Sequence, residues 1–125
     1  IEPNLGGDPV IVYDFPASQA ALAKINSEDP RVAHRFELYY QGIELANGYY
    51  ELQDATEQLE RFKRDNYNRQ NLNRPTKPID HQFIAAMEHG LPDCAGVALG
   101  LDRLLMCLQQ ASHINQVISF DQPRA

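Results

Sequence analysis

The sequence contains no tryptophan and only two cysteines among its 125 residues. Cys94 and Cys107 match neither a disulfide framework nor, with the four scattered histidines, a metal-ligand spacing. We therefore expect free thiols in a reducing compartment, the cytoplasm. No apolar run approaches the roughly 18 residues of a membrane helix, and no signal peptide is visible at the start, so we expect no membrane partner.

Basic residues are also few, with 11 Lys and Arg against 17 Asp and Glu. The net charge of −6 argues against bulk nucleic-acid binding. The bases are unevenly placed, because six of them lie between positions 61 and 77 beside a single acid, Asp65: Arg61, Lys63, Arg64, Arg69, Arg74 and Lys77. This segment fits either a solvated helix face and loop or a docking surface for an acidic partner.

The length suits one domain. Residues 1–9, with two glycines and two prolines, read as a loop or linker, and residues 10–125 as the domain. Residues 10–13 predict a short strand that ends in a turn at 14–16. Residues 33–52 alternate apolar and polar side chains around Gln41 and Gly42, which predicts a hairpin.

The predicted hairpin carries three carboxylates, Glu37, Glu44 and Glu51, with Asn47 between the last two. Three interpretations fit: a solvent-facing polar edge, a site for Mg²⁺ held with phosphates, and a site for an ammonium group. Asn47, Tyr49 and Glu51 share one face of a strand whereas Glu44 has the opposite parity. One pocket for all four requires a β-bulge between Glu44 and Asn47 or at the next glycine, and we predict that bulge.

Helices follow the hairpin. Asp54 predicts a helix start with Glu57 as capping partner, and the narrow apolar stripe predicts that only the first half of this helix docks. We expect a loop over residues 68–78, a second helix from Asp80, and a closing strand over residues 117–120. Together these elements predict an α+β fold, an antiparallel sheet with flanking helices.

The stretch from Gly96 to Arg103 reads as a strand that turns into a helix, with two glycines four residues apart. Glycines allow a ligand or a backbone to approach closely, and Arg103 lies where the first helical turn favours anions. A buried strand and helix without ligand and a nucleotide site both fit this pattern. A dinucleotide fold fits poorly, because the G-x-G-x-x-G spacing is absent.

Three stretches together resemble the catalytic core of class II lysyl-tRNA synthetases: Arg35-Phe36-Glu37, residues 44–52 (ELANGYYEL) and Gly96 to Arg103, which is similar to motif 3. The resemblance spans residues 10–125 and implies the C-terminal part of that core. Motifs 1 and 2, which supply the dimer interface and an arginine to the α-phosphate, are absent from the chain. The resemblance therefore implies an ATP-dependent aminoacyl ligase whose C-terminal part alone is inactive, and a homodimeric parent.

Within this family the chain is most similar to a truncated branch that attaches (R)-β-lysine to elongation factor P and does not charge tRNA. Residues 88–94 (EHGLPDC), residues 39–49, and Ala98 in place of the glycine usual in lysyl-tRNA synthetases carry this resemblance. One methyl group changes discrimination by roughly 1 to 3 kcal/mol, so Ala98 is a candidate selector between α-lysine and β-lysine. A lysyl-tRNA synthetase core and a non-catalytic binding module are the alternatives.

The resemblance also implies roles for individual residues, with ATP and Mg²⁺ as cofactors. Glu37 and Glu44 correspond to the carboxylates that hold Mg²⁺ with the ATP phosphates, and Arg103 to the arginine against the adenine, with Glu44 and Arg103 as catalytic residues. Gly100 falls in the ATP site. The corresponding substrate contacts are Asn47, Tyr49, Glu51, Gly96 and Ala98, with Glu51 on the side-chain ammonium of lysine.

Overall fold

A computed structural model describes residues 4–120. Its sheet consists of four antiparallel strands in chain order: β1 (Val10–Pro16), β2 (Val32–Tyr40), β3 (Ile43–Tyr50) and β4 (Ala95–Leu99). The helices are α1 (Ala55–Asn71), α2 (His81–Glu88) and α3 (Leu101–Gln109), with short 3-10 turns η2 (Ala17–Gln19) and η3 (Ile114–Gln116). The predicted α+β class with an antiparallel sheet is confirmed.

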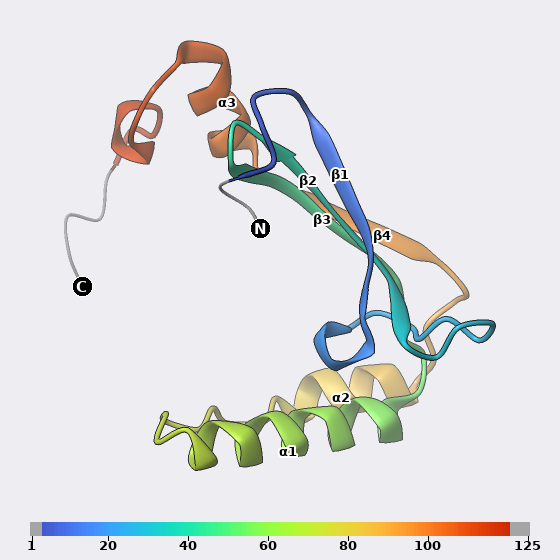
Figure 1. The fold of residues 1–125 in the computed structure, drawn as a ribbon. Coiled ribbons are helices and arrows are strands. Elements are labelled where there is room, and N and C mark those ends of the chain that lie inside the picture. Colours follow the sequence, from blue (N-terminus) through green and yellow to red (C-terminus); the bar gives the residue numbers. More distant parts are fainter. Residues whose placement is uncertain (1–3, 121–125) are drawn as a thin grey trace.

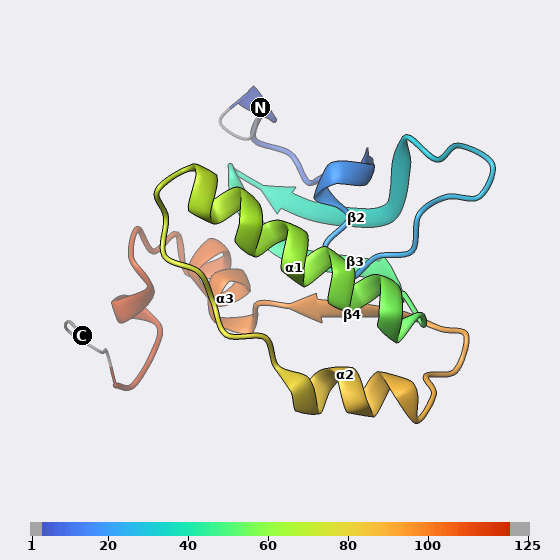
Figure 2. The same ribbon diagram turned by 90° about the horizontal axis from the view of Figure 1, so that it is seen from below.

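The helices lie at the two ends of the sheet. Figure 1 shows α1 and α2 together at one end and α3 at the other, directly after β4. Seen from below in Figure 2, α1 runs across the sheet in front of β2 and β3, with α2 beside it. Arg61 fastens α1 to the segment after β1, because its guanidinium donates to the carbonyls of Ala21 and Ala23 at 3.0 and 2.8 Å.

The β2–β3 hairpin forms where the alternating pattern predicts it. Tyr40 and Ile43 are opposed, and the two turn residues, Gln41 and Gly42, have φ values of 50° and 74°. Positive φ at both positions is the mirror-image turn whose twist matches that of paired strands. The predicted bulge is also confirmed, because Leu38 faces Ala46 while Tyr39 faces Glu44, which leaves Leu45 as the extra residue.

Three local predictions are wrong. The turn expected at residues 14–16 is an irregularity at Asp14, φ 56°, inside a strand that continues to Pro16. The loop expected from residue 68 begins later, because α1 continues to Asn71 and ends with Asn73 in the left-handed region at φ 53°. Residues 117–120 form no strand, since none of them pairs with the sheet and they follow η3.

Both predicted helix starts are confirmed. The Asp54 carboxylate accepts from the Glu57 N–H at 2.9 Å, and the Asp80 carboxylate accepts from two N–H groups of α2. The second half of α1 is largely exposed whereas Gln58 in its first half is 1% exposed, as the narrow stripe predicts. The helix therefore docks by its N-terminal half.

The two faces of the sheet differ in chemistry. One face, which we call the apolar face, exposes Ile11, Tyr13, Val97 and Leu99. The opposite face carries polar side chains and is turned toward α1 and α2; we call it the site face. One buried cluster consists of three alanines, Ala20, Ala23 and Ala33, with Ile25 and Tyr49 packed against it.

Candidate functional site

Most of the predicted site residues lie on the site face. Directly opposed residues of antiparallel strands point to the same side, so the register defines their rows. Three rows cross the site face, from the hairpin turn toward α1 and α2: Tyr39 and Glu44; Glu37, Asn47 and Ala98; Arg35, Tyr49 and Gly96. Glu51 follows Tyr49 with the same parity. The bulge at Leu45 is what turns Glu44 to this face.

The bulge also joins β3 to the start of α3. The Gly100 N–H donates to the Leu45 carbonyl at 2.8 Å, and Arg103 Nη1 donates to the Glu44 carbonyl at 2.8 Å. The same Nη1 lies 3.5 Å from the Glu44 carboxylate. Both side chains are partly exposed, Arg103 at 49% and Glu44 at 37%. A guanidinium and a carboxylate that are accessible at one end of the site face suit phosphate and metal chemistry.

Glu37 lies deeper, at 6% exposure. One of its carboxylate oxygens accepts from Arg35 and the other from the Tyr39 hydroxyl. Sequence reasoning did not identify Arg35 and Tyr39 as site residues, although their positions two residues either side of Glu37 put them on its face of the strand. Arg35 also stacks on the Phe15 ring, 4.4 Å from its centroid, and donates to the Gln19 carbonyl at 2.7 Å.

The other end of the site face is shaped by Glu51 and Gly96. A Cβ atom on Gly96 would lie 2.6 Å from Glu51 Oε1, so the carboxylate occupies the space that a side chain at position 96 needs. The Asn47 Oδ1 atom is buried without a hydrogen-bond partner among the described residues. A cavity of about 340 Å³ continues from Glu51 and Gly96 to the apolar side chains of α2, including Phe83 and Met87.

The groups at this end of the site face could accept hydrogen bonds from a cationic ligand. A buried amide oxygen without a donor is costly, and a carboxylate beside an apolar cavity needs a cation or a hydrogen-bond donor. Tyr49, opposite Gly96, supplies an aromatic wall next to both. A ligand with one ammonium group near Asn47 and another near Glu51 satisfies all of these groups.

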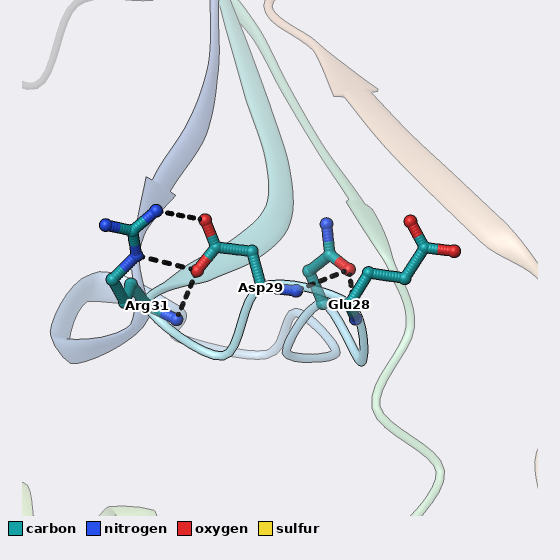
Figure 3. Close-up of polar contacts among 4 residues, drawn as sticks. Glu28, Asp29 and Arg31 are labelled. Carbon is teal, nitrogen blue, oxygen red and sulfur yellow. Dashed lines mark hydrogen bonds and ion pairs between the residues drawn. The ribbon is translucent and has the colours of Figure 1, made fainter.

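Other polar groups lie away from the site face. In the loop before β2, the Arg31 guanidinium donates two hydrogen bonds to Asp29, as Figure 3 shows, and lowers the pKa of this carboxyl from 3.8 to about 2. Tyr50 donates to Asp93 at 2.6 Å, which raises the pKa of the Tyr50 hydroxyl. Cys94 and Cys107 are free thiols.

No helix within residues 4–120 is long and apolar enough to cross a membrane. Among the same residues, no three His, Cys, Asp or Glu side chains group as ligands of a metal ion. Glu37 and Glu44 nevertheless offer two carboxylates from neighbouring strands on one face, and this donor set fits Mg²⁺ that takes its remaining ligands from nucleotide phosphates and water.

Comparison with known proteins identifies the family. The profile of the class II tRNA synthetases that are grouped as D, K and N matches residues 3–124. The chain belongs to this family. The position of Arg103 at the start of α3, after a glycine-containing strand, agrees with the motif 3 resemblance seen in the sequence.

Individual similar proteins carry more specific names than the family does. The chain is 60% identical over 126 residues to a Vibrio cholerae protein named elongation factor P–(R)-β-lysine ligase. Proteins of the same name from Haemophilus ducreyi and Hamiltonella defensa are each 56% identical over the same length. All three alignments cover 100% of this chain but only 38 to 39% of the relative. The chain therefore spans less than half the length of the curated relatives it matches.

Proposed function

We propose that this chain supplies the lysine-recognising half of an adenylating site. In the proposed reaction the carboxylate of (R)-β-lysine attacks the α-phosphate of ATP, pyrophosphate leaves, and the ε-amine of a lysine in elongation factor P takes the acyl group and releases AMP. Membership of the class II family and the names of the relatives support this reaction. Motifs 1 and 2 of the family are absent from the chain, so we propose that it is inactive alone. From the resemblance to the family we also propose that the whole protein is a cytoplasmic homodimer that does not act on tRNA.

The single observation that carries the proposal is the Glu51 carboxylate over Gly96, beside the unpartnered Asn47 Oδ1. In the proposed complex the side-chain ammonium of lysine donates to Glu51 and the second ammonium donates to Asn47. A hydrogen bond to a charged group contributes about 1.5 to 3 kcal/mol, and a lost partner leaves a buried acceptor unsatisfied. Tyr49 and Gly96 then shape the walls around the aliphatic part of the substrate.

In this proposal ATP binds at the end of the site face near the hairpin turn, which we call the nucleotide end. Its residues are Glu37, Glu44, Gly100 and Arg103. Glu37 and Glu44 would hold Mg²⁺ together with the ATP phosphates, and the ion would neutralise part of the phosphate charge. Arg103 shifts its planar guanidinium from the Glu44 carbonyl onto the adenine, with its charge near the terminal phosphate. The buried pairing of Glu37 with Arg35 and Tyr39 holds that carboxylate in one orientation before ATP binds.

The proposed residues act by position and charge, and none forms a covalent intermediate. Holding a carboxylate nucleophile in line with a phosphate contributes several kcal/mol by converting a bimolecular step into a unimolecular one. Ala98 lies opposite Asn47 on the same face, so its methyl group borders the backbone of the bound amino acid. We propose that this contact selects the β-isomer.

The test uses a full-length chimera in which this chain replaces the matching segment of the Vibrio cholerae relative; we call it the chimera. Lysine-dependent ATP–pyrophosphate exchange is measured in the chimera and in its Glu51→Gln variant. We expect the variant to raise the KM for lysine at least tenfold, because it removes one charge-assisted hydrogen bond. The matched control, Glu28→Gln in the exposed loop of Figure 3, leaves the KM unchanged. Equal values for both variants would exclude Glu51 as the ammonium partner.

A further inference from the structure

The basic residues of the chain fall into two groups. Ten lie within residues 4–120, and six of these form ion pairs with acidic side chains. The other four form no ion pair with a described acidic residue, and all of them lie in one segment: Arg64, Arg69, Arg74 and Lys77. We call these four residues the basic surface. All basic residues of the described part of the chain that lack an ion pair thus fall within 14 positions, in a protein whose net charge is −6.

The remainder of the chain has the opposite charge. Residues 61–77 contain six bases and one acid, whereas the other residues contain five bases and sixteen acids. Such segregation produces a local positive field on an acidic protein, and a field of this kind attracts a partner of opposite charge and orients it. A nucleic acid would meet repulsion from the acidic remainder, so the charge pattern favours an acidic protein surface as partner.

The backbone that carries the basic surface is held in a fixed shape, although none of its four side chains is ion-paired with a described acidic residue. The Asn66 side chain bonds both the N–H and the carbonyl of Lys77, at 2.9 and 2.8 Å, and Arg69 Nε donates to the Pro75 carbonyl at 2.8 Å. These bonds fasten the loop after α1 against the helix. Arg64, Arg74 and Lys77 remain exposed, so a partner meets a preorganised set of charges and loses little loop entropy on binding.

The basic surface also lies on the correct side of the molecule. Figures 1 and 2 show α1 at one end of the sheet, beyond the ends of β2 and β3, with α2 beside it. A cavity of about 510 Å³ runs from Arg35 on the site face to Arg64 and Asn68 on α1. A protein bound at the C-terminal half of α1 therefore faces the site and can extend a segment into it.

We propose that the basic surface docks the protein substrate, through acidic side chains that flank the lysine to be modified. This inference rests on the proposed function, because it assigns the acceptor of that reaction to a surface. Docking contributes to acceptor binding and not to adenylate formation. The two steps of the reaction therefore respond differently to a change in these charges.

The experiment compares three charge reversals in the chimera: Arg64→Glu, Arg74→Glu and, as control, Arg31→Glu. Arg31 is also exposed but lies in the loop of Figure 3 and is already paired with Asp29. We expect each of the first two to raise the KM for elongation factor P about threefold, and the pair about tenfold, because exposed ion pairs are individually weak. The control changes it little. The effect shrinks as salt rises, since the interaction is screened.

The outcomes separate this inference from the proposed function. Lysine-dependent pyrophosphate exchange stays constant in all variants if the surface serves only docking. A chimera without exchange or transfer contradicts the proposed function, whereas an active chimera whose acceptor KM is the same in all variants overturns the docking surface alone. Loss of exchange together with a lower Tm in Arg64→Glu and Arg74→Glu would also overturn it, because the surface would then pack inside the protein. The docking surface would also be overturned if the protein bound RNA, the variants abolished that binding, and the KM for elongation factor P stayed unchanged.

Discussion

Gly96→Ala is the substitution for which the structure gives the clearest magnitude. The new methyl carbon would lie 2.6 Å from Glu51 Oε1, well inside van der Waals contact, and no other group except the Glu51 carboxylate lies within 4 Å of it. The end of a flexible side chain moves easily, so the carboxylate rotates away. Stability is maintained, because alanine in a strand is favoured over glycine by roughly 0.5 to 1 kcal/mol.

The binding of lysine, in contrast, should weaken. The displaced carboxylate loses its hydrogen bond to the substrate ammonium, which contributes about 1.5 to 3 kcal/mol, and this corresponds to a rise in KM for lysine of about 10- to 150-fold. The KM for ATP should change little, since the nucleotide end lies at the other end of the site face. Pyrophosphate exchange in the chimera measures both constants, and urea unfolding checks stability.

Gly7→Ala is the matched control. Its added methyl would meet no atom within 4 Å, and Gly7 does not have a positive φ. We expect wild-type constants for this variant. An unchanged lysine KM in Gly96→Ala would refute the assignment of Glu51 to the substrate ammonium, and an equal rise in the KM for ATP would show a general distortion of the site.

Three further predictions concern other parts of the molecule. Ala98→Gly should shift the ratio of kcat/KM values for (R)-β-lysine and α-lysine in pyrophosphate exchange toward α-lysine by about 5- to 150-fold, since one methyl group discriminates by roughly 1 to 3 kcal/mol. An unchanged ratio would exclude Ala98 as the selector. Tyr39→Phe removes a hydrogen-bond donor to the buried Glu37 carboxylate and retains the packing of the ring, so it should raise the Mg²⁺ concentration that gives half-maximal exchange. An unaltered Mg²⁺ dependence would contradict a role of Tyr39 in holding Glu37. The Asp29 carboxyl titrates at a lower pH in the folded chain than its usual 3.8, so the stability it contributes is complete above about pH 4 and is lost as pH falls toward about 2. In Arg31→Gln the pKa of Asp29, measured by NMR titration, should rise from about 2 toward 3.8 without reaching it, because the backbone N–H of residue 31 still donates to the carboxylate; a value that stays near 2 would show that another group is responsible.

The sequence was informative where local rules and the required chemistry agreed. The bulge at Leu45 followed from a parity conflict, because Glu44 and Asn47 reach one face only if an extra residue lies between them. The hairpin turn and both aspartate caps followed from residue types that these positions favour. Arg35 and Tyr39 were missed as partners of Glu37 because each also fits an ordinary alternating strand.

Two of the wrong predictions have different causes. Residues 117–120 have β-forming side chains, but strand propensity depends on a neighbouring strand, and the register leaves them none in the described sheet. The two asparagines and the arginine of residues 68–71 suggested a loop, yet these residues continue α1. Asn73, which adopts the left-handed conformation, was the better marker of the helix end.

The central claim is tested most directly by the intact mass of elongation factor P after incubation with the chimera, ATP and (R)-β-lysine. The account predicts that the factor gains one lysyl group on a lysine side chain, that omission of ATP prevents this gain, and that Glu51→Gln slows it at limiting (R)-β-lysine. An unmodified factor, in a reaction where the chimera instead charges tRNA with α-lysine, would contradict the account.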